Sequence, residues 1–85
     1  MVREIKKVTR SNTFIKQIKH LDSFLLEKLK RQITKILENP EIGKPLNYKR
    51  GERSIYLWPF RIVYAIIDEG LIFLKFEHRK SVYKN

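Results

Sequence analysis

The sequence lacks cysteine altogether, and it holds only three glycines and three prolines among its 85 residues. Without cysteine there is no disulfide framework and no thiolate metal site, and two histidines alone make a structural zinc site unexpected. No apolar run reaches the roughly 20 residues of a membrane-spanning helix, and the N-terminus lacks the apolar region of a secretory signal. We therefore expect one cytoplasmic domain, residues 1–85, with a small hydrophobic core.

Acidic residues are the scarcer charge class. Nine Asp and Glu residues stand against nineteen Lys and Arg residues, which gives a formal net charge of +10. A field of this strength attracts polyanions, so nucleic acid is the first candidate partner, an acidic protein the second and a membrane surface a distant third. The alternative is a basic surface that serves only solubility.

Two apolar segments lie close together in the second half of the chain. Residues 60–67 are rich in β-branched and aromatic side chains, and residues 71–76 repeat this pattern. Short apolar runs of this kind predict buried strands. The intervening Asp68-Glu69-Gly70 predicts a three-residue hairpin loop with Gly70 in the left-handed conformation.

The predicted loop sets the pairing of the two strands. It places Ile67 opposite Leu71 and Arg61 opposite Glu77. A two-residue Glu69-Gly70 turn would instead place Arg61 opposite His78, but the first register separates charged from apolar side chains. In that register one face carries Arg61, Lys75, Glu77 and Arg79, and the core face carries Tyr64, Ile66, Ile72, Leu74 and Phe76.

The first half of the chain predicts an edge strand and two helices. Residues 1–9 form a short, partly β-branched segment in which Val2, Ile5 and Val8 lie among charged side chains, which favours an edge strand guarded by lysines. Apolar residues then recur at helical spacing over residues 14–21, after the capping residues 11–13, and over residues 25–37. Asn39-Pro40 ends the second helix, because the residue before proline resists the α conformation. The two helices form an αα-hairpin, with a first helix of about three turns.

Residues 53–58 predict a further strand, joined to the central one by Trp58-Pro59. This turn places Tyr56 opposite Arg61 and Ser54 opposite Val63, so Tyr56 and Ser54 join the face of Arg61. Ile55 and Leu57 then face the core. The fold class is therefore α+β, with an N-terminal strand, an αα-hairpin and a three- to four-stranded twisted antiparallel sheet.

Phosphate chemistry is the best match for the remaining polar residues. The sequence has no glycine-rich phosphate loop and no Ser/His/Asp set. Arg61 and Arg79 offer rigid donor forks suited to phosphate oxygens, Tyr83 can stack on a base or transfer a proton, and His78 can act as acid or base. With the ribose 2′-OH as nucleophile, such a site needs no metal or cofactor. Further candidates for substrate contact are Lys49, Arg50, Arg53, Tyr56, Lys75 and Lys80. The competing interpretation of Arg61 is a cross-strand ion pair with Glu77.

The chain resembles the RelE/ParE toxin superfamily of toxin–antitoxin modules over nearly its whole length. The motifs that carry the resemblance are residues 39–46, with Asn39-Pro40 and Gly43-Lys44-Pro45-Leu46, residues 60–64 and residues 78–83. The resemblance implies a RelE/ParE-like, microbial-RNase-like fold and an acidic, RelB-like antitoxin as partner. We expect residues 11–38 to form much of the surface that the antitoxin contacts.

The two branches of the superfamily imply different activities. The RelE branch implies a metal-free endoribonuclease that cleaves mRNA in the ribosomal A site, with Arg61, Arg79 and Tyr83 at the positions of its functional residues. The ParE branch implies inhibition of DNA gyrase without nuclease activity, and a basic RNA-binding module without catalysis is a third possibility. The C-terminal tyrosine favours RelE. However, RelE-like toxins carry two basic residues where this chain has Ser54 and Tyr56.

Overall fold

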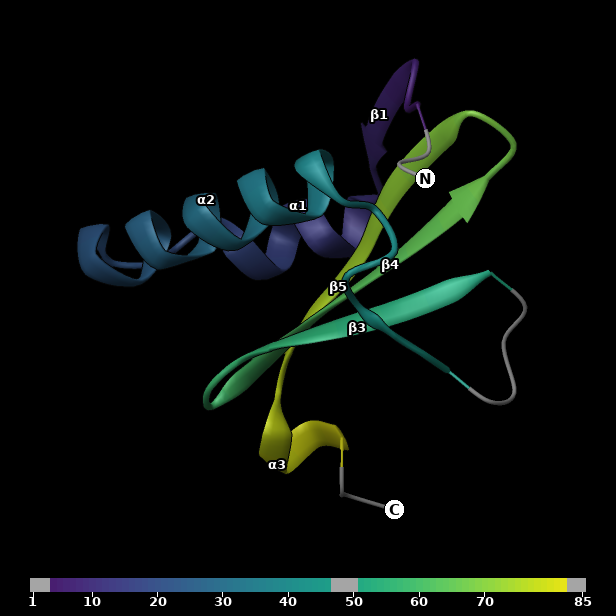
Figure 1. The fold of residues 1–85 in the computed structure, drawn as a ribbon. Coiled ribbons are helices and arrows are strands. Elements are labelled where there is room, and N and C mark those ends of the chain that lie inside the picture. Colours follow the sequence, from purple (N-terminus) through teal and green to yellow (C-terminus); the bar gives the residue numbers. More distant parts are fainter. Residues whose placement is uncertain (1–3, 47–50, 83–85) are drawn as a thin grey trace.

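The computed structural model of the protein describes residues 4–46 and 51–82. It has an α+β fold, as the sequence predicts (Figure 1). The elements in chain order are β1 (Lys7–Arg10), α1 (Asn12–Ile18), α2 (Ser23–Glu38), β2 (Lys44–Pro45), β3 (Glu52–Leu57), β4 (Phe60–Ile67), β5 (Gly70–His78) and α3 (Arg79–Val82).

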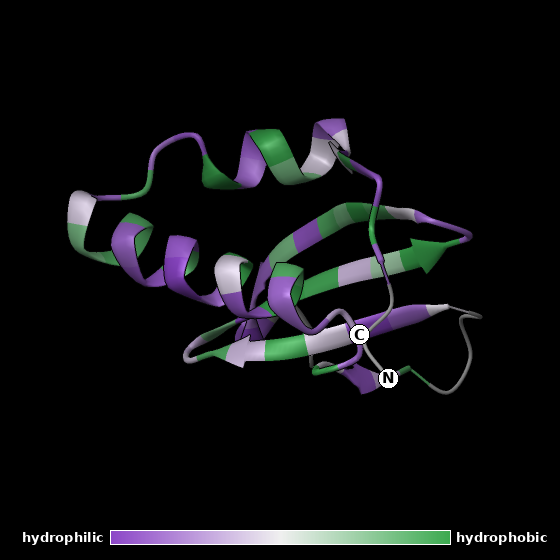
Figure 2. Cartoon of the chain, turned by 45° about the horizontal axis from the view of Figure 1, so that its top comes forward, coloured by the Kyte–Doolittle hydropathy of each residue, from purple (hydrophilic) through white to green (hydrophobic). Residues whose placement is uncertain are grey.

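The sheet is larger and more mixed than predicted. It has five strands in the order β1-β5-β4-β3-β2, and β1 runs parallel to β5 whereas the other pairs are antiparallel. The predicted edge strand is confirmed as β1, although it begins at Lys7 and ends at Arg10. Helices α1 and α2 lie on the same side of the sheet (Figure 2). Among the described residues, no helix is long and apolar enough to cross a membrane.

The core lies between the two helices and the central strands. Side chains buried there come from both helices, β4 and β5: Phe14, Leu29, Ile36, Ile62, Tyr64, Leu71, Phe73 and Phe76. Both helices begin at capping side chains, because Ser11 Oγ accepts a hydrogen bond from the Phe14 amide and Asp22 Oδ1 accepts one from the Leu25 amide. Helix α1 ends at Ile18, so it is about one turn shorter than predicted. Leu21, after the helix, still packs against the core.

The β4–β5 hairpin corrects the predicted loop. From Phe60 to Val63 the predicted register holds, and Arg61 lies opposite Glu77. Beyond Val63 the register shifts by one residue, and Tyr64 pairs with Phe73. The loop therefore has two residues, Asp68 and Glu69. Asp68, not Gly70, has the positive φ of 56°.

The register shift leaves Leu74 as an additional residue in β5, which makes a β-bulge. A one-residue shift exchanges the two faces of a strand. Leu71 and Phe73 are therefore buried in the core, whereas Ile72 and Leu74, which the sequence pattern places there, are only half-buried. The Ser11 hydroxyl donates a hydrogen bond of 2.7 Å to the Leu74 carbonyl, so the residue that caps α1 also satisfies the backbone at the bulge.

The β3–β4 hairpin forms as predicted. Leu57 lies opposite Phe60, Tyr56 opposite Arg61 and Ser54 opposite Val63. The Trp58–Pro59 peptide bond in the turn is cis. Ile55 and Leu57 pack against the core. Ser54 and Tyr56 consequently lie on the opposite face of the sheet, together with Arg61.

Candidate functional site

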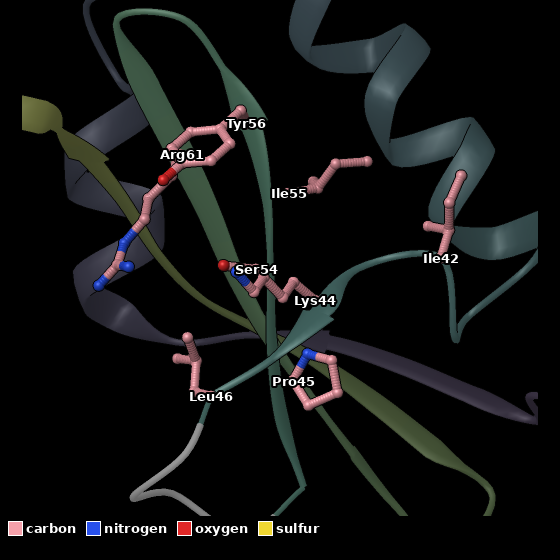
Figure 3. Close-up of a pocket in the computed structure, with 8 residues that line it drawn as sticks. All are labelled: Ile42, Lys44, Pro45, Leu46, Ser54, Ile55, Tyr56 and Arg61. Atoms are coloured by element: carbon pink, nitrogen blue, oxygen red, sulfur yellow. The ribbon is translucent and has the colours of Figure 1, made fainter.

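A pocket of about 410 Å³ opens on the face of the sheet that carries Arg61 (Figure 3). This volume lies within the range of small-molecule and nucleotide sites. Residues from β4, from β3, from β2 and from the segments flanking β2 line it: Ile42, Lys44, Pro45, Leu46, Ser54, Ile55, Tyr56 and Arg61. The pocket therefore combines two cations and an exposed phenol ring with an apolar rim.

Arg61 is held in place by Glu77. Its Nε donates a hydrogen bond of 2.8 Å to Glu77 Oε2, and the two side chains are 20% and 17% exposed. The predicted cross-strand ion pair is thus present. Among the described residues this is the only hydrogen bond of the guanidinium group, so its terminal nitrogens remain available to a ligand. A planar fork presented in this way suits phosphate oxygens.

Lys44 enters the pocket because of strand pairing. It lies opposite Ser54 in the β2–β3 ladder, and directly opposite residues place their side chains on the same face. Ser54 is one of the two positions at which the resemblance to RelE-like toxins implies a basic residue. The neighbouring strand therefore provides a cation on the face where β3 has none.

The segment before β2 is fixed by a buried tyrosine. The Tyr64 hydroxyl donates a hydrogen bond of 2.6 Å to the Pro40 carbonyl and accepts one of 3.0 Å from the Gly43 amide. Arg53 Nη1 donates to the carbonyls of Gly43 and Glu41, at 2.7 and 3.1 Å. These bonds determine where residues 42–46 run along the pocket.

Burial of the Tyr64 hydroxyl raises its pKa above the ordinary value, while the bond from Gly43 and the nearby Arg53 charge act in the opposite direction. The folded protein thus retains the phenolic proton more strongly than the unfolded chain. The stability from this group is complete below about pH 10 and is lost as pH rises through the folded-state pKa.

We expect the free energy of unfolding to fall above about pH 10, and to fall less in Tyr64→Phe than in the wild type. Urea titrations between neutral pH and about pH 11 measure this difference. Tyr56→Phe is the matched control, because it removes the hydroxyl group of a side chain that is 62% exposed. Parallel declines in Tyr64→Phe and the wild type would contradict the expectation.

Five other predicted site residues that the structure describes, Arg53, Lys75, His78, Arg79 and Lys80, are not among the residues that line this pocket. Arg53 is engaged with the segment before β2, and Arg79 begins α3 instead of extending the strand face, with its guanidinium carbon 4.5 Å from the Trp58 ring centroid. His78 lies opposite Phe60, packs edge-on against that ring at 5.1 Å and accepts a hydrogen bond at Nδ1 from the Lys80 amide. Lys75 and Lys80 are exposed outside the pocket lining.

Three candidates, Lys49, Arg50 and Tyr83, lie outside the described residues. Within the described part of the chain, no three side chains of His, Cys, Asp or Glu gather as a metal site requires. The site residues predicted from the sequence did not include Lys44 or Trp58, although Lys44 belongs to a basic loop that could contact phosphates. The sequence contains a feature that marks each residue. Lys44 lies in the Gly43-Lys44-Pro45-Leu46 motif, and Trp58 is the only tryptophan of the sequence.

Residues 8–83 match the family of ParE toxins of type II toxin–antitoxin systems. A search of curated proteins gave no match.

Several solved structures share the fold. The RelB–RelE antitoxin–toxin complex of Methanococcus jannaschii aligns with a TM-score of 0.73 and 22% identity over 88% of this chain and 94% of that one. The RelBE2 toxin–antitoxin complex of Mycobacterium tuberculosis gives a TM-score of 0.73 and 23% identity over 93% and 94% of the two chains. YafQ of E. coli BL21(DE3) gives a TM-score of 0.74 and 22% identity over 93% and 99%.

The family match spans nearly the whole chain and includes all the strands that build the pocket. The fold shared with the RelE and YafQ structures agrees with it. The chain therefore belongs to the RelE/ParE superfamily of toxins from type II toxin–antitoxin systems.

Proposed function

We propose that this toxin is a metal-free endoribonuclease that cleaves mRNA in the ribosomal A site. The observation that carries the proposal is the Arg61 pocket, where a guanidinium oriented by Glu77 faces a nucleotide-sized cavity beside Lys44 and Tyr56. The net charge of +10 supports it, because phosphate contacts by cations dominate binding to nucleic acid.

In the proposed reaction the ribose 2′-oxygen attacks the adjacent phosphorus atom. A P–O bond forms to the 2′-oxygen, and the P–O bond to the 5′-oxygen of the next nucleotide breaks. The products are a 2′,3′-cyclic phosphate and a 5′-hydroxyl, and the proton lost by the 2′-OH balances the one gained by the leaving oxygen. No oxidant, reductant or water is consumed.

The residues of the pocket have distinct roles in this proposal. The terminal nitrogens of Arg61 stabilise the negative charge that grows on the phosphate oxygens. Lys44 neutralises the same group from β2, and Tyr56 stacks on a neighbouring base. Arg79 and Tyr83 keep the catalytic roles that the resemblance to RelE-like toxins implies for them. We assign no proton transfer to His78, because it lies on the other face of the sheet from Arg61.

A second candidate function is inhibition of DNA gyrase. The match to the ParE family favours it, and so do Ser54 and Tyr56 at the positions of the basic pair of RelE-like toxins. In that case the pocket has no catalytic role and the Arg61–Glu77 pair is structural.

We also propose a cognate acidic antitoxin. RelB and DinJ accompany RelE and YafQ in their solved complexes. In this chain the helical hairpin, residues 11–38, exposes Phe24 and Leu37 among basic residues. An acidic amphipathic segment would cover the apolar side chains and neutralise the charge.

A translating extract separates the two activities. We expect added toxin to produce truncated mRNAs cut at codon-phased positions within translated regions, with 5′-hydroxyl ends. An mRNA without a start codon is the control and should remain intact. DNA breaks or gyrase inhibition with intact mRNA would overturn the proposal in favour of the ParE activity.

A further inference from the structure

Trp58 is exposed in a way that folding does not explain. It is the only tryptophan of the chain, it lies in the β3–β4 turn, and it is 65% exposed. Tryptophan is highly buried on average in folded proteins, because its large apolar surface is costly to leave in water. An exposed indole beside a candidate site therefore indicates a binding role.

An arginine covers one side of this indole. The guanidinium carbon of Arg79 lies 4.5 Å from the ring centroid, within the distance of a cation–π contact. The Arg79 amide also donates a hydrogen bond of 2.7 Å to the Pro59 carbonyl, which ties the start of α3 to the turn. The ring and the cation are thus held together by the backbone, while most of the indole surface stays open to solvent.

The turn is adjacent to the Arg61 pocket along the chain. Tyr56, two residues before Trp58, lines that pocket and is 62% exposed. Arg61, three residues after Trp58, lies opposite Tyr56 in the β3–β4 ladder. Two exposed rings and two guanidinium groups therefore occur within one hairpin and the start of α3.

We propose that Trp58 and Arg79 form a stacking platform for an unpaired base of a single-stranded RNA whose phosphate occupies the Arg61 pocket. This inference rests on the proposed function and assigns a binding site to a residue outside the Arg61 pocket. Proteins that bind single strands combine cations along the backbone with aromatic rings on which bases stack, and such stacking tolerates any base. The Arg79 cation over the ring and the net charge of +10 favour RNA over an apolar protein segment.

Tryptophan fluorescence tests the platform directly, because its signal comes from Trp58 alone. The probes are a 2′-O-methyl oligouridine, which lacks the nucleophile and so stays intact, and an abasic oligomer of the same length and charge. We expect the oligouridine to quench the fluorescence and the abasic oligomer to bind without quenching it.

Anisotropy of labelled oligomers measures affinity in the variants. We expect Trp58→Ala to bind the oligouridine about 5- to 100-fold more weakly than the wild type, and Trp58→Phe to recover part of the loss. Affinity for the abasic oligomer should not change. Phe24→Ala is the matched control, because Phe24 is 70% exposed and has its own cation, Lys28 Nζ, at 4.4 Å, but lies on α2.

Equal affinity of Trp58→Ala and the wild type for oligouridine, or binding of oligouridine without quenching, would overturn the inference. So would quenching by a purified acidic antitoxin and not by RNA, which would make the platform a protein contact. If the proposed function is wrong but the platform exists, oligouridine would still quench the Trp58 fluorescence while mRNA in a translating extract stayed intact. Codon-phased cleavage without quenching would instead refute only the platform.

Discussion

Replacement of Arg61 with alanine is expected to slow mRNA cleavage about 100- to 1,000-fold, the usual cost of removing one charge-stabilising donor from an active site. The wild-type guanidinium faces the pocket, and among the described residues only its Nε is engaged, by Glu77. Its terminal nitrogens would bind the phosphate most strongly when charge builds up in the transition state, so the loss should appear in kcat. Single-turnover cleavage of ribosome-bound mRNA measures it.

A second variant separates catalysis from folding. Arg61→Ala leaves the Glu77 carboxylate, only 17% exposed, without its partner, and this alone can destabilise the protein. Arg61→Lys keeps a positive charge for Glu77 but loses the planar fork, so we expect it to fold and still to lose about tenfold or more in rate. Arg31→Ala removes one exposed charge from α2 and controls for net charge. Wild-type cleavage by folded Arg61→Ala and Arg61→Lys would exclude a catalytic role for this residue.

Replacement of Gly43 with alanine is expected to lower the free energy of unfolding by about 2–4 kcal/mol. A Cβ at this position would lie 2.7 Å from the Tyr64 hydroxyl oxygen, 2.9 Å from Tyr64 Cε1 and 3.0 Å from the Ser54 carbonyl oxygen. Tyr64 is fully buried and has no room to withdraw. The bonds from its hydroxyl to the Pro40 carbonyl and the Gly43 amide would therefore be stretched or broken.

This change is large for a domain of this size, whose total stability is on the order of 4–13 kcal/mol. Thermal unfolding should show a decrease in Tm of roughly 10–25 °C. Gly70→Ala is the matched control, because its Cβ would come no closer than 3.4 Å to another atom, the Ile67 carbonyl oxygen, and we expect a change below about 1 kcal/mol. Similar losses in both variants would show that Gly43 is not specifically constrained by Tyr64.

The short turn between β3 and β4 explains why the pairing of these two strands could be predicted from the sequence, whereas the pairing of β4 with β5 could not. Trp58-Pro59 is short enough to fix one pairing of β3 with β4, and the structure has that pairing throughout. The β4–β5 register depends instead on the bulge at Leu74, whose carbonyl is bonded by Ser11 from 63 residues away. The hydrophobic pattern of residues 71–76 has no strict alternation that would reveal such a shift.

The candidate site likewise contains residues that the sequence pattern places correctly and one residue, Lys44, that only long-range pairing brings in. Alternation along β3 and its predicted pairing with β4 placed Ser54, Tyr56 and Arg61 on a common face, and the structure keeps them there. Lys44 reaches that face only because the two-residue strand β2 pairs with β3. That pairing depends on Tyr64 and Arg53 holding the segment before it, through bonds that span 10 to 24 residues.

The sequence by itself determined the order of the two long helices and of the strands β1, β3, β4 and β5, the two-sided character of the sheet, the strongly basic charge and the motifs that resemble the toxin superfamily. These properties follow from periodicity, composition and short motifs, which depend on neighbouring residues. Tertiary structure alone decided that Glu77 engages Arg61 through Nε, that Lys44 joins the pocket and that Arg79 covers Trp58. Such contacts depend on side-chain direction and strand pairing, which long-range packing and hydrogen bonds set.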